Sequence, residues 1–121
     1  MKILVADDSR AMRMIVTRTL RQAGFAGHDI IEAENGKEAL ETVVRQSIDL
    51  ILSDWNMPEM TGIEFLRALR AKGVKTPFCF VTSEGSEEMR EQAQAAGAVG
   101  LIAKPFTPEA FVDILSPVVT A

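Results

Sequence analysis

Residues 51–62 read ILSDWNMPEMTG, a stretch in which an apolar run ends on a carboxylate, Asp54. Trp55 and Asn56 follow at once, and two methionines and a proline come after them. A strand that leaves a protein core more commonly passes into a turn of small polar residues. Asp54 alone would suit an ordinary turn, but the acid, amide and bulky side chains together suggest a functional site at the end of a buried strand.

The composition is typical of one soluble globular domain. The chain has 121 residues and a mass of 13.2 kDa, with 47% hydrophobic and 25% charged residues, which is enough for one buried core. The net charge is −4 and the basic residues form no cluster, so nucleic acid is not an expected partner. Arg10, Arg13, Arg18 and Arg21 are expected on the solvated face of a helix.

The single cysteine, Cys79, lies between Phe78 and Phe80, where a small buried apolar side chain is expected rather than a reactive thiol. One cysteine allows no internal disulfide and is typical of a reducing compartment. The amino-terminal apolar run is too short for a signal peptide, and no apolar stretch approaches the roughly 20 residues that span a bilayer. These features predict a cytoplasmic protein that does not bind membranes.

Five short apolar runs alternate with amphipathic stretches along the chain. The runs have the length of β-strands, and three of them are almost continuously apolar, as in parallel strands covered on both faces. The expected strands are residues 2–6, 29–33, 49–53, 78–82 and 100–104.

The stretches between these strands carry apolar residues at helical spacing. In the first, Met12, Ile15, Val16 and Leu20 form one stripe, and Ser9 suits the position of the amino-terminal cap. Further helices are expected around residues 40–44, 65–69, 87–96 and 107–117. This (βα)₅ alternation predicts an α/β fold, a doubly wound five-stranded parallel sheet in a single domain spanning residues 1–121.

Polar side chains follow four of the five expected strands. Asp7 and Asp8 come after the first strand, Asp54 after the third, Thr82 after the fourth and Lys104 after the fifth. Sites in open parallel sheets lie at the carboxyl ends of the strands. Neighbouring strands are only about 5 Å apart, so adjacent strand ends would bring these groups into one cleft.

Carboxylates gathered in this way suggest magnesium-dependent phosphate chemistry. Close carboxylates repel one another, and a hard divalent cation with oxygen ligands relieves the repulsion. Asp54 could then act as a nucleophile towards phosphorus, with Thr82 and Lys104 stabilising the oxygens of the transferred group. The expected reaction is phosphorylation of Asp54.

Each of these residues also has an ordinary structural explanation. Paired acids after a strand often cap a helix, Thr82 with Ser83 could cap the fourth helix, and Lys104 could be a surface lysine. Their joint placement at four strand ends is what these separate explanations leave unexplained.

The motifs ADDS, SDWNMPEMTGIEFLRALR, FVTSE and AKPFT together resemble those of the receiver domains of bacterial two-component response regulators. The resemblance covers the whole chain and is nearest to the single-domain regulators of chemotaxis. It implies a flavodoxin-like sheet with strand order 2-1-3-4-5. It also implies a phosphoacceptor signalling protein that catalyses its own phosphorylation and dephosphorylation, rather than an enzyme acting on a separate substrate.

The resemblance assigns a role to each matching residue. Asp54 corresponds to the phosphoacceptor, and Asp8 with Asp54 to the direct Mg²⁺ ligands. Asp7 corresponds to an acid that binds the metal through water, and the backbone carbonyl of Asn56 to a further ligand. Thr82 corresponds to the switch hydroxyl.

Further positions follow from the same resemblance. Lys104 corresponds to the lysine that pairs with the phosphoryl group, and its bond to Pro105 to a cis peptide. Asn56 and Glu84 flank the path of the attacking water, so their amide and carboxylate predict a short-lived acyl phosphate. Leu101 stands where the family often has an aromatic switch residue, which puts the usual coupling of that residue to the threonine in doubt.

The resemblance implies a histidine kinase as phosphoryl donor and a monomer that docks a target protein through its fourth helix, fifth strand and fifth helix. A phosphorelay intermediate or a phosphate sink is an alternative role. A phosphatase of the haloacid dehalogenase type also uses a strand-end aspartate, but it needs a second aspartate two residues later, where this chain has Asn56. A docking module that no longer accepts phosphate is the remaining alternative.

Overall fold

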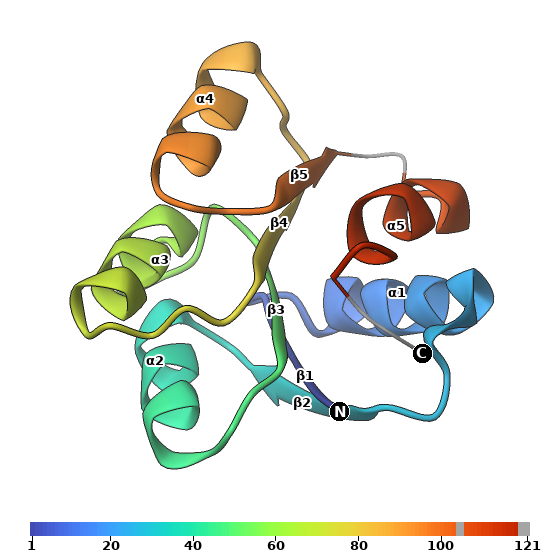
Figure 1. Ribbon diagram of the computed structural model, residues 1–121, viewed down its shortest axis with the longest axis horizontal. Coiled ribbons are helices and arrows are strands. Elements are labelled where there is room, and N and C mark those ends of the chain that lie inside the picture. The colour runs from blue at the N-terminus through green and yellow to red at the C-terminus, as the bar shows by residue number, and fades with distance from the viewer. Residues whose placement is uncertain (104–105, 119–121) are drawn as a thin grey trace.

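The computed structural model describes residues 1–103 and 106–118. Strands and helices alternate along the chain, as the hydrophobic pattern predicts (Figure 1). The strands are β1 (Lys2–Ala6), β2 (Asp29–Ala33), β3 (Leu50–Ser53), β4 (Phe78–Thr82) and β5 (Gly100–Ala103). The helices are α1 (Arg10–Leu20), the π-helical turn η1 (Arg21–Phe25), α2 (Gly36–Arg45), α3 (Gly62–Ala71), α4 (Glu87–Ala95) and α5 (Pro108–Leu115).

The five strands form one parallel sheet in the order β2-β1-β3-β4-β5. This confirms the doubly wound α/β fold and the strand order expected from the sequence. Helices α2, α3 and α4 cover one face of the sheet, and α1 and α5 cover the other (Figure 1). Because every strand runs the same way, all five carboxyl ends lie along one edge, where the polar residues were expected.

The alternation of side chains along each strand divides the core into two layers. Leu4, Ile51 and Phe80 belong to the layer under α2, α3 and α4, whereas Val5 and Leu52 belong to the layer under α1 and α5. Both faces of the central strands are therefore apolar, which explains their nearly continuous apolar sequences. Among the described residues, no helix is long and apolar enough to cross a membrane.

Side-chain caps fix where the helices begin. The Ser9 hydroxyl accepts the Met12 N–H at the start of α1, as expected, and Thr107 accepts the Ala110 N–H at the start of α5. Helix α4 is capped by Ser86. Thr82 and Ser83 are therefore not the cap of α4, and the buried Thr82 hydroxyl is left to face the carboxyl end of the sheet.

Helix α1 departs from the sequence expectations at two positions. Ile15 was placed in the apolar stripe, but its side chain is 41% exposed. Arg13 was expected in solvent, but it is one of the buried charged residues. Val16 and Leu20 of the predicted stripe are buried as expected, but the buried side of the helix also includes Arg13. Arg13 finds hydrogen-bond partners in other elements, and the sequence of one helix does not contain that information.

Cys79 is fully buried on β4, in the layer under α1 and α5. Burial raises the pKa of its thiol to about 12, so the thiolate is scarce at neutral pH and the side chain is unreactive. The expectation of a small buried apolar residue is confirmed.

Candidate functional site

The acids that end β1 and β3 lie together at the carboxyl edge of the sheet. Asp7, Asp8 and Asp54 each offer a carboxylate oxygen, and these oxygens all lie within 4.8 Å of one another. The sheet itself sets the positions, because Ala6 on β1 is paired with Ser53 on β3. The backbone N–H of Asp54 then donates to the Ala6 carbonyl at 2.9 Å, so the pairing continues into the first residue of the loop.

Asp7 is the buried acid of this cluster. Only 4% of its surface is exposed, and burial raises the pKa of its carboxyl to about 6, with further increases from the nearby charges of Asp54 and Asp8. The Ser9 N–H donates to its Oδ1 at 2.8 Å and lowers the pKa in part. A buried carboxyl among like charges favours either a proton or a cation.

Asp54 is only half-buried, yet burial still raises the pKa of its carboxyl above the ordinary value. The Trp55 N–H donates to its Oδ1 at 2.8 Å, and a hydrogen bond to the Thr82 side chain also favours the ionised form. Both interactions lower the pKa in part, against the larger effect of burial. Thr82 is fully buried at the end of β4, so the adjacent strands β3 and β4 bring the acid and the hydroxyl together.

The loop after β3 is packed tightly against the carbonyl of Asp54. A Cβ atom at Gly62 would lie 2.1 Å from that carbonyl oxygen, so only glycine fits there. The Gly62 N–H donates to the Trp55 carbonyl at 2.8 Å. The Trp55 ring packs on Phe80 with centroids 4.7 Å apart. The segment that follows Asp54 is therefore a compact loop that closes on the start of α3.

The remaining predicted site residues are not members of the acidic cluster. Asn56 and Glu84 are both exposed, on the loops after β3 and β4. Leu101 is buried on β5, and its carbonyl accepts a hydrogen bond from the Arg90 side chain on α4 at 2.9 Å. The expected pairing of Lys104 with the phosphoryl group and the expected cis bond to Pro105 lie outside the described residues.

Arg13 is a residue near the site that sequence reasoning missed. Its Nη1 donates to the Asp7 carbonyl, at 2.6 Å, and its Nε donates to Glu32 Oε1 on β2, at 2.8 Å. The only local signal is that an arginine interrupts the buried face of α1. That signal becomes meaningful once the strand order places β2 next to β1.

The donor set suits a hard divalent cation. Carboxylate and backbone carbonyl oxygens are the ligands that Mg²⁺ prefers, and it commonly takes one or two carboxylates and keeps several waters. Burial, and to a smaller extent the neighbouring like charges, raise the pKa values of Asp7 and Asp54, and such an ion would offset both effects. The residues present therefore fit magnesium.

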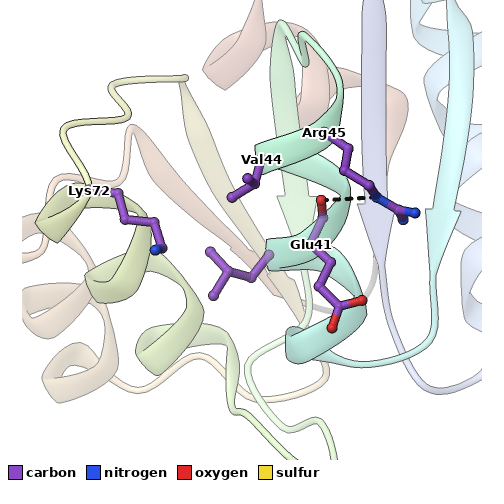
Figure 2. A pocket seen from close by; sticks show the side chains of 5 residues that line it. Glu41, Val44, Arg45 and Lys72 are labelled. Atoms are coloured by element: carbon purple, nitrogen blue, oxygen red, sulfur yellow. Dashed lines mark hydrogen bonds between the residues drawn. The ribbon is translucent and has the colours of Figure 1, made fainter.

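A hollow elsewhere on the surface has different chemistry. About 380 Å³ in volume, it lies between α2 and α3 and is lined by Leu40, Glu41, Val44, Arg45 and Lys72 (Figure 2). The Arg45 Nε donates to the Glu41 carbonyl within α2, at 3.4 Å. These residues belong to the carboxyl-terminal parts of the helices, whereas the acids lie at the opposite end of the sheet. The hollow thus contributes nothing to the acidic cluster.

Comparison with known proteins agrees with this geometry. Residues 3–116 match the response regulator receiver domain. The chain belongs to the response regulator receiver family. The family resemblance drawn from the sequence motifs is thereby confirmed, and the haloacid dehalogenase alternative loses its support.

Similar members of the receiver family are chemotaxis proteins. The chain is 40% identical to a CheY homologue of Campylobacter jejuni, covering 98% of this chain and 92% of that protein. It is 38% identical to CheY1 of Helicobacter pylori, covering 98% and 96%. The solved structure of CheY4 from Vibrio cholerae matches with a TM-score of 0.84 and 40% identity, covering 98% of each chain.

Proposed function

We propose that residues 1–121 form a single receiver domain that accepts a phosphoryl group on Asp54 from the phosphohistidine of a histidine kinase. The observation that carries the proposal is the cluster of Asp7, Asp8 and Asp54 at the carboxyl edge of the sheet, with the Thr82 hydroxyl beside it. Membership of the receiver family supports the same reaction.

All three acids would help to bind the metal, and Asp54 would also be the nucleophile. Asp8 and Asp54 would bind Mg²⁺ directly, Asp7 through water, and the Asn56 backbone carbonyl would complete the protein's share. When bound, the ion supplies positive charge that offsets the charge on the phosphoryl oxygens.

In the transfer step, an oxygen of the Asp54 carboxylate attacks phosphorus and forms an O–P bond while the N–P bond of the donor histidine breaks. The electron pair of that bond returns to the imidazole. The Trp55 N–H keeps the carboxylate oriented for attack, which supplies proximity at little entropic cost. Thr82 then donates its hydroxyl hydrogen to a phosphoryl oxygen, and we assign the pairing with another oxygen to Lys104.

Hydrolysis of the acyl phosphate would restore Asp54. Water attacks phosphorus and the Asp54 oxygen leaves, giving inorganic phosphate. Asn56 and Glu84 are exposed side chains on the two loops beside the acid, and we assign them to the path of this water. Replacing Asn56 with arginine would block that path and slow dephosphorylation, and an unchanged rate would remove the assignment.

The output would be docking of a partner protein. We propose that phosphorylation changes the face formed by α4, β5 and α5, and that the protein serves chemotaxis, as the names of its relatives indicate. Leu101 is buried and has no ring to expose, so we assign the change to Thr82, the loop after β4 and α4. We expect a cytoplasmic monomer, with a phosphorelay intermediate or phosphate sink as the alternative role.

Trp55 emission offers a direct test, because this residue is the only tryptophan and adjoins Asp54. Magnesium and then acetyl phosphate or beryllofluoride would be added to the wild type, to Asp54→Asn and to a control, Asp113→Asn, whose side chain is exposed on α5. We expect two successive saturable changes in the wild type and the control, with the second absent from Asp54→Asn. Mass spectrometry would detect one phosphoryl group. No response and no added mass would favour a docking module that does not accept phosphate.

A further inference from the structure

Arg13 is buried near the acidic cluster without being one of its proposed ligands. Its side chain is 8% exposed, and its partner Glu32 is 52% exposed. A buried guanidinium must be paired and hydrogen-bonded to be tolerated, and an apolar side chain of similar size commonly stabilises a fold equally well or better. Stability alone therefore does not explain an arginine at this position, and its hydrogen-bond partners become the important feature.

The two bonds of Arg13 join three segments that are separate in the sequence. Arg13 stands in the first turn of α1, the Asp7 carbonyl lies in the loop before that helix, and Glu32 lies on β2. The neighbour of Glu32, Ala33, accepts the backbone N–H of Asp7 at 3.0 Å. Both peptide groups of Asp7 are thus fixed, one by β2 and the other by the guanidinium.

A fixed backbone at Asp7 also determines where the next residue can lie. The Asp7 carbonyl belongs to the peptide bond that leads into Asp8, so the bond from Nη1 sets the plane of that peptide. The Asp8 carboxylate that follows this peptide is exposed. The guanidinium thus constrains the backbone segment that carries both Asp7 and Asp8.

We infer that Arg13 is a positioning residue for the metal site, holding the loop of Asp7 and Asp8 in the geometry that Mg²⁺ requires. The inference rests on the proposed function. Mg²⁺ demands a near-ideal octahedron, and residues that orient metal ligands without touching the metal typically account for 10- to 100-fold in affinity or activity. Glu32 orients the guanidinium in turn and neutralises its charge.

Magnesium affinity of matched variants tests this role. Trp55 emission would be titrated with Mg²⁺ in the wild type, Arg13→Ala, Arg13→Lys and Glu32→Gln, with Arg18→Ala on the exposed face of the same helix as control. We expect the half-saturating Mg²⁺ concentration to rise about 10-fold or more in Arg13→Ala. The rise should be smaller in Arg13→Lys and Glu32→Gln, which keep part of the hydrogen bonding, and absent in Arg18→Ala.

Two further measurements separate positioning from support of the fold. Phosphorylation by acetyl phosphate should be slow in Arg13→Ala at low Mg²⁺ and approach the wild-type rate at saturating Mg²⁺, because the nucleophile itself is unchanged. Melting without Mg²⁺ would record the loss of stability separately. If Arg13→Ala does not fold, Arg13→Lys and Glu32→Gln replace it in the test, and we expect both to raise the half-saturating Mg²⁺ concentration.

Several outcomes would overturn the inference. A loss of stability with unchanged Mg²⁺ affinity in the Arg13 variants would reduce Arg13 to a structural role and leave the proposed function intact. An equal loss of affinity in Arg18→Ala would show a general effect of charge. No Mg²⁺ response in the wild type would instead refute the proposed function, and the inference with it.

Discussion

The loops that follow β3 and β4 carry neighbouring groups of the site but are built differently. In the loop after β3, Trp55 packs on Phe80, Met57 is buried, and Gly62 closes on the Asp54 carbonyl. In the loop after β4, residues 83–86 are all exposed. The hydrogen bond from the Glu84 N–H to Thr82 Oγ1 is long, at 3.4 Å.

This difference suggests a division of labour between the two loops. A segment with few buried contacts and exposed backbone opens at low free-energy cost, whereas a packed one moves only with the core. In the proposed mechanism, the packed loop after β3 would keep the Asp54 carboxylate in place, and the exposed loop after β4 would rearrange when Thr82 turns to the phosphoryl group. Substitutions that perturb one loop at a time can therefore test whether the two loops differ in stability and mobility.

The largest effect is expected from Gly62→Ala. Alanine is the better helix former by about 0.5–1 kcal/mol, but its Cβ would lie 2.1 Å from the backbone oxygen of Asp54. Overpacking typically costs about 1–3 kcal/mol and occasionally more, and we expect the upper end here because the clashing atom belongs to the backbone. Urea denaturation would measure the loss. Gly85→Ala is the matched control, because its Cβ would meet side chains rather than backbone, those of Ala103 at 2.7 Å, Leu101 at 3.3 Å and Arg90 at 3.4 Å, and the exposed loop can shift. Equal losses would contradict the comparison.

An intermediate effect is expected from pH in the metal-free protein. The pKa of Asp7 is about 6 in the folded protein against an ordinary 3.8, so the folded state binds more protons than the unfolded state between these values. The free energy of unfolding from this group therefore falls as pH rises through that window, by an amount on the order of 2 kcal/mol.

Denaturation with a chelator present, near pH 4 and near pH 7, would measure this effect in the wild type and in Asp7→Asn. The comparison of variants is needed because other carboxyls act in the opposite direction: hydrogen bonds from Thr61 lower the pKa of Glu64. We expect the difference between wild type and variant to change with pH and to shrink in saturating Mg²⁺. A difference independent of pH would show that neither burial nor the neighbouring charges raise the pKa of Asp7.

The smallest effect is expected from Ser86→Ala. Its hydroxyl accepts the Met89 N–H at 3.1 Å and caps α4, so removing it should cost about 1 kcal/mol. Helix α4 has a single buried residue, Ala93, and amide hydrogen exchange should rise in α4 far more than in α3. Ser83→Ala, which removes an exposed hydroxyl outside the cap, should leave exchange unchanged. A rise spread evenly over α3 and α4 would show that the two loops are coupled.

Much of the fold and of the acidic cluster could be predicted because both follow from local patterns and one rule of sheet geometry. The apolar runs predicted the strand boundaries, and the predicted bounds of β3 and β5 differ from the observed ones by one residue. The carboxyl-end rule then brought together Asp7, Asp8, Asp54 and Thr82, residues from three different strand ends.

Arg13 and Ile15 could not be predicted in the same way. Their helix offers two plausible buried faces, and the choice between them depends on Glu32 and the Asp7 carbonyl, which other segments supply. The sequence leaves the cap of α4 open for a related reason. Ser83 and Ser86 both suit a cap, and the choice depends on how far the loop after β4 extends before the helix begins.

The bond between Arg90 and the Leu101 carbonyl has a consequence for solubility. Strand β5 is an edge of the sheet, and open edges are templates on which strands of other molecules can pair and aggregate. An acceptor already occupied by a guanidinium from α4 is a poor template, and the charge repels a second copy carrying the same arginine. The side chain thus helps keep concentrated protein from joining edge to edge.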